Sequence, residues 1–336
     1  MRLGIVGAGE VAWRHAAAAA EVDGLTLITV ADRDADRARR LAERYGARAA
    51  PDLDALLAAV DLVVLAVPHA YHAELTVQAA AAGCRVLVEK PMATTVEDCD
   101  RMIAAAGERL YVGQQGRFFA QVSAARDELA RLGAPLLYAE RRSTDYAHPG
   151  RPAWFTDARL AGGGIAMLVG VHSIDRACFL LGAPLEAVAG SVAVPAGWAV
   201  ESDAAMTLSF AGAPSAHVML VDSPRFFHET TIVCERGRLS IDASGLTVDG
   251  RRVLEVDGDR EYTASFRRQY EALLRGRPMA TPAEGRQAVA AVQALYRSAA
   301  SGGATVPLSG PVRFPPPDEG SVQGCGSSRP ASTTGP

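Results

Sequence analysis

The sequence is almost without lysine. Of its 34 lysine and arginine residues only one, Lys90, is a lysine. A general preference for arginine explains the surface cations, but it does not explain why one position keeps lysine. The lysine amino group is a compact donor whose pKa burial can lower, whereas arginine stays charged and planar. We therefore expect position 90 to depend on the properties of lysine.

Charge, cysteine pairs and long apolar runs are also scarce. A formal net charge of −4 does not indicate a nucleic-acid-binding face. The five cysteines are odd in number and show no CxxC spacing, so neither a metal site nor a disulfide framework is expected. No apolar run looks long enough to span a bilayer, and the chain enters a strand at once, which leaves no room for a signal peptide. We predict a cytoplasmic protein with neither a membrane nor a nucleic acid as partner.

The length of 336 residues suits two domains, and 49% of the residues are apolar. In the first half, apolar runs without period-2 alternation are separated by helical segments that often stop at glycine, which predicts a doubly wound parallel sheet covered on both faces. The predicted strands lie at residues 2–9, 25–32, 61–68, 84–91 and 109–114, and the predicted helices at 10–21, 33–45, 53–59, 71–82 and 96–106.

The pattern changes from about Phe118 onwards. Short strands in series with hairpin-like spacing predict an α+β domain with a mainly antiparallel, open sheet. Residues 305–336, which are rich in Pro, Gly and Ser, predict a disordered tail. We thus predict an N-terminal Rossmann domain at 1–117, an α+β domain for substrate and oligomer contacts at 118–304, and the tail.

A glycine-rich segment follows the first predicted strand. Gly7 and Gly9, followed by Glu10, Val11 and Ala12, form a GxGxxA pattern. The glycines allow a tight turn and a close approach of backbone to a pyrophosphate, and the N-terminus of the following helix attracts the phosphate charge. Alone the pattern is weak evidence, but here it follows a strand and opens a helix.

An acidic residue supports the same interpretation. Asp32 ends the next strand, 20 residues after Ala12, where a carboxylate can bind the adenosine ribose hydroxyls. A carboxylate repels a 2′-phosphate, so Asp32 favours NAD over NADP, although Arg33 could offer that phosphate a partial site. We therefore predict NAD or NADP as cofactor, with NAD favoured.

Three further segments resemble one known family. They are AVPHAYHAE (66–74), EKP (89–91) and GGGIAMLVGVHSID (162–175). Together with the GxGxxA pattern and Asp32, they are similar to the glucose–fructose oxidoreductase / inositol dehydrogenase / rhizopine catabolism family. The resemblance extends from Arg2 to about Gly303. It implies a Rossmann domain, a nicotinamide cofactor, a sugar or cyclitol substrate and a homo-oligomer, dimer or tetramer, formed through the open sheet.

The resemblance also implies roles for individual residues. Lys90 would lie at the active site, and His172 would be the general acid or base. The other positions fall in two groups. The cofactor positions are Glu89, which shapes the cofactor end, and Pro68 and His72, which lie near the nicotinamide. The positions that border the substrate cleft are Arg117 and Trp154.

The chemistry of hydride transfer independently requires such a pair. Moving a hydride to or from a carbinol carbon requires a proton to leave or join its oxygen. A histidine can carry that proton, and a cationic lysine can polarise the oxygen. Lys90 ends a predicted parallel strand, where ligands bind in open α/β sheets.

One position departs from the family pattern. Many members have an Asp four residues before the active-site His, and this chain has Leu168 there. Spacing i, i+4 predicts Leu168 and His172 on one helix face, so the change removes a carboxylate from the substrate cleft. We expect the pKa of His172 to be lower without this carboxylate. We also expect a substrate that either has fewer hydroxyl groups than an inositol or is held by the 144–154 loop through Asp145 and Tyr146.

We therefore predict an NAD(P)-dependent oxidoreductase that acts on CH–OH groups. Two other functions remain open from sequence: a redox-neutral NAD-dependent glycosidase, and a nucleotide-binding protein without turnover. Net consumption of cofactor distinguishes the oxidoreductase from the glycosidase. Binding of cofactor without turnover would indicate the nucleotide-binding protein.

Overall fold

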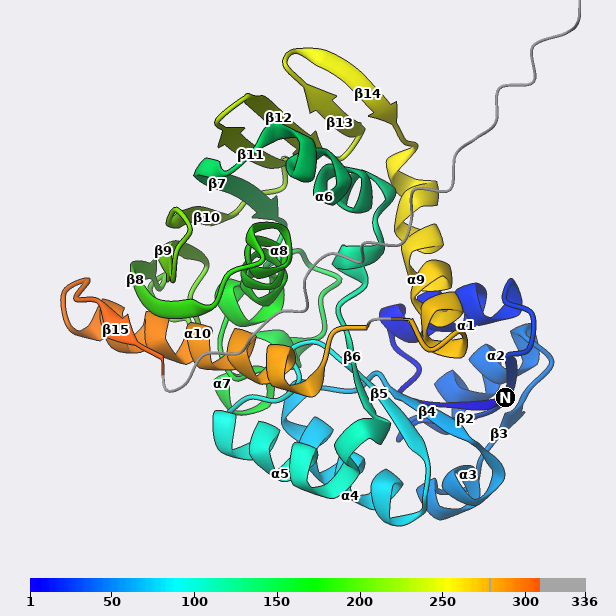
Figure 1. Cartoon of the computed structure of the whole chain (residues 1–336). Coiled ribbons are helices and arrows are strands. Elements are labelled where there is room, and N and C mark those ends of the chain that lie inside the picture. Colours follow the sequence, from blue (N-terminus) through cyan, green and yellow to red (C-terminus); the bar gives the residue numbers. More distant parts are fainter. Residues whose placement is uncertain (278, 309–336) are drawn as a thin grey trace, which may run out of the picture.

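The computed structural model describes residues 1–277 and 279–308. It contains two sheets, one in each half of the chain, joined by helices (Figure 1). The tail predicted at 305–336 therefore lies, beyond residue 308, outside the described residues.

The N-terminal half folds as the predicted doubly wound sheet. Its six strands are parallel, in the order β3-β2-β1-β4-β5-β6. The central strands are almost entirely buried, because helices cover both faces, which explains their unbroken apolar runs. The strands are β1 (Arg2–Val6), β2 (Thr26–Ala31), β3 (Arg48–Ala49), β4 (Leu62–Leu65), β5 (Arg85–Glu89) and β6 (Leu110–Gly113). The exposed two-residue strand β3 was not predicted.

Five α-helices connect these strands close to their predicted bounds. They are α1 (Glu10–Ala20), α2 (Ala35–Arg44), α3 (Leu53–Ala59), α4 (His72–Ala81) and α5 (Val96–Ala106). Asp34, Asp52 and Thr95 cap α2, α3 and α5 by accepting backbone N–H groups with their side chains. By contrast, Gly9 precedes α1 without a side-chain cap, which leaves the first N–H groups of α1 available for a ligand.

The second half forms the predicted, mainly antiparallel sheet. Its order is β14-β13-β12-β11-β7-β10-β9-β8-β15, and only the β7–β10 pair is parallel among the described strands. The strands are β7 (Pro135–Thr144), β8 (Leu185–Ala193), β9 (Asp203–Phe210), β10 (Ala216–Asp222), β11 (His228–Cys234), β12 (Gly237–Asp242), β13 (Gly245–Val248), β14 (Arg251–Glu255) and β15 (Val306–Pro307). Strands β14 and β15 were not predicted.

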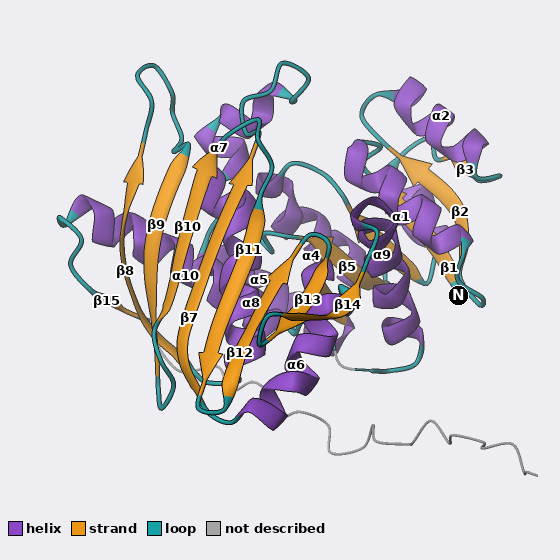
Figure 2. Cartoon of the chain, turned by 90° about the horizontal axis from the view of Figure 1, so that it is seen from above, coloured by secondary structure: helices purple, strands orange, loops and turns teal. Residues whose placement is uncertain are grey.

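Helices cover one face of this sheet and leave the other open (Figure 2). On the open face, Leu137 and Met219 are 42% and 50% exposed. The covering helices are α6 (Ala120–Leu132), α8 (Val171–Leu181) and α10 (Pro282–Ala300).

The segment Ala158–Leu181 corrects one expectation. It is long and apolar enough to cross a membrane by length and composition, with a mean hydropathy of 1.5 over its best window. The structure buries 83% of that window, as is typical of a core helix in a protein of this shape. The segment consists of α7 (Ala158–Ala161), a turn, a π-helical stretch η5 (Ala166–Gly170) and α8.

The two halves share core residues. Helix α9 (Gly258–Leu274) packs against α1 and buries Phe266 and Tyr270 in the apolar core of the N-terminal half. Val289 of α10 likewise packs in the core beneath β5 and β6. The cleft between the halves is therefore bounded by well-packed elements on both sides.

Candidate active site

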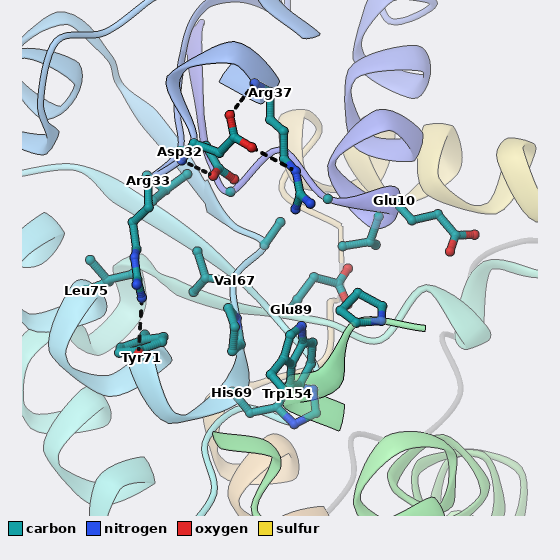
Figure 3. Close-up of a pocket in the computed structure, with 18 of the residues that line it drawn as sticks. Glu10, Asp32, Arg33, Arg37, Val67, His69, Tyr71, Leu75, Glu89 and Trp154 are labelled. Carbon is teal, nitrogen blue, oxygen red and sulfur yellow. Dashed lines mark hydrogen bonds and ion pairs between the residues drawn. The ribbon is translucent and has the colours of Figure 1, made fainter. Parts of the chain in front are cut away.

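A cavity of about 910 Å³ lies at the carboxyl ends of the parallel strands (Figure 3). The glycine turn after β1 and the ends of β2, β4 and β5 form one wall, and residues 148–155 with Leu168 and Tyr262 contribute from the second half. The cavity lies at the point where the strand order reverses between β1 and β4, which is where open α/β sheets bind ligands.

The glycine turn has the geometry that a dinucleotide needs. Gly7 has a φ of +95°, and a Cβ atom there would lie 2.2 Å from the carbonyl oxygen of Ala66. A Cβ atom on Gly9 would meet no atom within 4 Å, so at this position the backbone faces open space. Both glycines line the cavity together with Glu10 and Val11 of α1. The uncapped N-terminus of α1 therefore opens onto the cavity and favours an anionic group there.

Asp32 and Arg33 follow β2 and line the same wall of the cavity (Figure 3). The Asp32 carboxylate accepts the backbone N–H of Ala8 at 2.6 Å and that of Asp34 at 2.8 Å, which holds it beside the glycine turn. The Arg33 guanidinium donates to the Tyr71 hydroxyl at 3.5 Å across the cavity. These residues fit the adenosine part of a dinucleotide, because the carboxylate retains lone pairs for ribose hydroxyls.

Glu89 is held by a buried histidine. His15 Nε2 donates to Glu89 Oε1 at 2.9 Å, which leaves Nδ1 to accept the Tyr270 hydroxyl at 2.8 Å. Burial opposes ionisation of Glu89, but the hydrogen bond from His15 and the charge of Lys90 bring the pKa of the carboxyl below its usual range. Glu89 therefore presents a fixed negative charge beside Lys90.

Lys90 follows β5 and lines the cavity, as predicted for a residue at the end of a parallel strand. Its amino group donates to the carbonyl oxygen of Leu168 at 3.0 Å, which joins the two halves of the chain at this point. Burial lowers the pKa of Lys90 to about 8, with Glu89 opposing the shift and Arg142 and Arg151 adding to it. A lysine with a pKa this close to neutrality suits proton chemistry.

His172 lies in the first turn of α8 and is 8% exposed. Burial lowers the pKa of His172 well below its usual range, and the positive charges of Lys90, Arg142 and Arg176 lower it further. The imidazole is therefore neutral at neutral pH. No hydrogen bond of His172 occurs within the described part of the chain.

Several other predicted residues line the cavity. They are Pro68 after β4, Leu168 in η5 and Trp154 in η4 (Ala153–Thr156). The Trp154 ring stacks on Phe155 with centroids 3.9 Å apart and meets His69 edge-on at 4.9 Å. His69 is held in turn by the carbonyl oxygen of Ala161, 2.8 Å from its Nδ1. These aromatic rings form an apolar wall opposite the glycine turn.

Four predicted residues, His72, Tyr146, Arg117 and His172, are not among the described residues that line this cavity. His72 is fully buried, with its ring nitrogens 2.9 Å from the Pro91 carbonyl oxygen and 3.0 Å from that of Val67. It therefore holds the segment next to Lys90 instead of facing a cofactor. Tyr146 is also fully buried, and its hydroxyl donates to the Phe155 carbonyl oxygen at 2.5 Å.

Arg117 is the third. Its guanidinium donates to Asp175 at 2.6 Å and lies 3.1 Å from Glu284, and all three side chains are buried. These carboxylates raise the pKa of Arg117 despite its burial. Arg117 thus ties η3 (Gln115–Phe118) to α8 and α10 and is not available to a substrate in the cavity.

Other residues that no sequence motif indicated also line the cavity. Arg151, Phe155, Tyr71 and Tyr262 all contribute to it. The 144–154 loop was expected to hold a substrate through Asp145 and Tyr146, whereas the residues of this loop that line the cavity include Arg151 and Trp154. No sequence motif marks Arg151 or Tyr262, because the fold of the second half alone brings them to the glycine turn.

The glycine turn at an uncapped helix, the acidic residue after β2 and the strand order together define a dinucleotide-binding protein of the Rossmann type. Residues 1–114 match the family described as "Oxidoreductase family, NAD-binding Rossmann fold", and residues 128–240 match the "GFO/IDH/MocA C-terminal domain". The chain belongs to this GFO/IDH/MocA family of oxidoreductases, and its N-terminal half is an NAD-binding Rossmann domain. The predicted family and fold class are thereby confirmed.

Curated relatives match little more than half of the chain. The chain is 34% identical over 193 residues to D-glucoside 3-dehydrogenase of Escherichia coli (strain K12), covering 55% of each. It is 35% identical over 196 residues to dTDP-3,4-didehydro-2,6-dideoxy-alpha-D-glucose 3-reductase of Actinomadura kijaniata, covering 56% of this chain and 58% of the relative. The match thus spans little more than half the length of these curated relatives.

A solved structure matches over more of the chain. GenD2 from gentamicin A biosynthesis, in complex with NAD, superimposes with a TM-score of 0.81 at 26% identity. The match covers 92% of this chain and 97% of that one, so it includes both sheets.

Proposed function

We propose that the protein is an NAD(P)-dependent oxidoreductase that moves a hydride between nicotinamide and a carbinol or carbonyl carbon of a sugar, cyclitol or related small molecule. The observation that carries this proposal is the position of Lys90. The sole lysine of the chain lies in the cavity that begins at the glycine turn, with a pKa near neutrality. The names of both curated relatives place their reactions at carbon 3 of a sugar, which supports the same class of substrate.

The bound cofactor supplies the site that accepts or delivers the hydride. Lys90, which is mainly cationic at neutral pH, polarises the substrate oxygen. We assign the proton step to His172, which is neutral there: it would accept the hydroxyl proton during oxidation and return it during reduction, from a position outside the described lining of the cavity. Leu168 adds no charge to this end of the cavity, which suits a substrate with fewer hydroxyl groups than an inositol.

NAD is the preferred cofactor in this proposal. Asp32 presents a carboxylate where the adenosine ribose would lie, and a 2′-phosphate there would be repelled. Arg33 already donates to Tyr71, which reduces what it can offer to such a phosphate.

The site of action and the assembly also belong to the proposal. The cytoplasm is the proposed compartment, and the open face of the second sheet is the proposed oligomer contact. The exposed Leu137 and Met219 on that face support the second point.

The experiment is to follow nicotinamide absorbance with NAD and with NADP against a panel of sugars, cyclitols, keto sugars and simple diols. Lys90→Arg should keep cofactor binding yet lose turnover by about 100-fold or more, because a planar guanidinium cannot replace the compact amino group. His172→Asn should remove the acidic limb of the pH–rate profile. Full activity of Lys90→Arg would overturn the assignment of Lys90, and sugar hydrolysis without net cofactor consumption would point to a glycosidase instead.

A further inference from the structure

The charges that line the cavity are unevenly distributed. All the carboxylates among its lining residues belong to the first 89 residues, on the wall that carries the glycine turn. The residues that the second half contributes include His148 and Arg151 and no carboxylate. Lys90 lies between the two, and its amino group bonds to a carbonyl oxygen instead of a carboxylate. The end of the cavity next to Lys90 therefore has positive charge without an anionic partner from the second half.

Arg151 contributes directly to this positive end. It lies in the loop between β7 and η4 and lines the cavity. Its guanidinium lies over the Phe155 ring, 4.7 Å from the centroid, and one terminal nitrogen donates to the Asp145 carbonyl oxygen at 2.8 Å. Its Nε atom is buried and has no hydrogen-bond partner among the described residues. The stacking fixes the plane of the guanidinium while one donor remains unused.

Arg142 is a second arginine whose positive charge acts on Lys90, although it is not among the described residues that line the cavity. It lies on β7 two residues after Glu140, so both side chains point to the sheet face that α8 covers. Its Nε atom is also buried without a partner among the described residues. Burial and the nearby Arg176 lower the pKa of Arg142 to about 10, with Glu140 opposing the shift.

Glu140 makes no hydrogen bond to Arg142 among the described residues, although its charge favours the cationic form of that arginine. The Tyr138 hydroxyl donates to Glu140 at 2.8 Å, the Ser173 hydroxyl at 2.6 Å, and His228 Nε2 lies 3.1 Å away. A buried charge that is only partly compensated is costly, and an anionic ligand would reduce that cost.

From this arrangement we infer that the substrate carries an anionic group, a carboxylate or a phosphate, that Arg151 binds this group, and that the charge of Arg142 attracts it from outside the cavity lining, while the carbinol carbon of the substrate lies next to Lys90. The inference rests on the proposed function and narrows its substrate class to acidic or phosphorylated sugars. Guanidinium groups suit both anions because their paired N–H donors match two oxygens at once. Leu168 is consistent with it, since an acidic side chain there would repel the anion.

The test is calorimetric titration of the NADH-loaded protein with matched ligands: glucose, glucuronate, glucose 1-phosphate and UDP-glucose. Binding needs no turnover, so the result stands apart from the outcome of the activity panel. We expect at least one anionic ligand to bind about tenfold or more tightly than glucose. The carboxylate and phosphate ligands distinguish the two kinds of anion.

Variants then assign the binding to the two arginines. Arg142→Gln and Arg151→Gln should each raise the Kd for the anionic ligand by about tenfold or more. Neither variant should change the Kd for glucose or for NADH. Arg142→Lys, which keeps the charge, should recover part of the affinity. Arg141→Gln is the matched control: its exposed side chain lies on the same strand, on the open face, and pairs with Glu229.

Three results would overturn the inference. Glucose could bind as tightly as every anionic ligand, which would leave the proposed oxidoreductase standing with a neutral substrate. Arg151→Gln could weaken the binding of NADH instead of the binding of the sugar ligand, which would assign that arginine to the cofactor diphosphate. Finally, anionic ligands could bind equally well to both glutamine variants.

Discussion

At the scale of single residues, Lys90 is the most informative position in the chain. Its environment explains why arginine could not replace it: the amino group lies next to the Leu168 carbonyl, partly buried, with a pKa lowered to about 8. An arginine there would stay charged at every relevant pH and would need space for a planar group. The same environment makes Lys90 costly for stability, because a buried cation loses hydration.

This cost predicts a stabilising substitution. Lys90→Met should raise the free energy of unfolding at pH 7 by about 2 kcal/mol, a value reduced because the amino group is partly exposed. The pKa is about 8 in the folded protein and 10.5 unperturbed, so the cost is fully present below pH 8 and disappears as the pH rises towards 10.5. Urea denaturation from pH 6 to pH 10 would measure the gain.

The matched control is Arg85→Met, which removes an exposed cation from the same strand. It should change the free energy of unfolding little at any of these pH values. If Lys90→Met and the wild type were equally stable at pH 7, the lowered pKa of Lys90 would not have the desolvation origin assigned to it.

Residues of the candidate site differ in how far the sequence predicts them. Gly7, Gly9, Asp32 and Lys90 lie in short motifs next to strands, and each lines the cavity as expected. Arg117 was expected in the substrate cleft, but its partner Asp175 lies 58 residues away. No local pattern indicates such a partner, since ion pairs of this kind depend on how helices pack.

At the scale of elements, the segment that carries Leu168 and His172 is not one regular α-helix. Residues Ala166–Gly170 are π-helical, and the N–H of Val171 donates to the carbonyl oxygen of Ala166, five residues earlier. The i, i+4 relation of an α-helix therefore does not hold here. Leu168 lines the cavity, whereas His172 lies behind it and is almost fully buried.

Glu201 anchors the start of this segment. Its carboxylate accepts the N–H groups of Gly164 and Ala166 at 2.8 and 3.0 Å and the Tyr296 hydroxyl at 2.8 Å. A Cβ atom on Gly164 would lie 1.9 Å from the Glu201 carbonyl oxygen, so only glycine fits this approach. The element that presents Leu168 is thus held by a residue 37 positions later in the chain.

We expect Glu201→Ala to lower the free energy of unfolding by about 2–4 kcal/mol, because three buried donors lose their acceptor. Turnover should fall as well, since the loosened segment carries the carbonyl that Lys90 contacts. Denaturation in urea and kcat would report the two effects. The comparison is Glu186→Ala, which removes an exposed carboxylate at the start of β8 and should change neither the free energy of unfolding nor kcat. A fully stable and active Glu201→Ala would show that the carboxylate does not anchor the segment.

At the scale of the whole molecule, two connections hold the halves of the chain around the cleft. Helix α9 packs on α1 through buried aromatic rings. The cluster of Arg117, Asp175 and Glu284 joins η3, α8 and α10 in the interior. The predicted domain limits at 117 and 304 remain a prediction, and α9, placed in the second domain by them, packs on the core of the first.

Removing the cation from this cluster tests its importance. Arg117→Ala should lower the free energy of unfolding by about 3–5 kcal/mol at pH 8, because two buried carboxylates lose their counter-charge. Burial already raises the pKa of Asp175 despite Arg117, so without Arg117 a carboxyl can take up a proton as the pH falls. The loss should therefore be smaller at pH 5 than at pH 8.

Urea denaturation at the two pH values measures this difference, with Arg131→Ala, an exposed i, i+3 pair with Glu128, as the comparison. That variant should lose less than about 1 kcal/mol at either pH. An Arg117→Ala protein as stable as the wild type at pH 8 would mean that the cluster does not hold the halves together.

The sequence by itself determined the class of fold and the positions of the glycine turn, Asp32 and Lys90 after parallel strands, where all of them line one cavity. These follow from local rules: apolar runs mark strands that are covered on both faces, and ligands meet the carboxyl ends of parallel strands. Only the tertiary structure decided that His72, Tyr146 and Arg117 bond to buried partners away from the cavity lining. It also decided that the Nε atoms of Arg142 and Arg151 are buried without a hydrogen-bond partner among the described residues. The reason is physical: the role of a polar side chain depends on its partners, and folding alone brings those partners from distant parts of the chain.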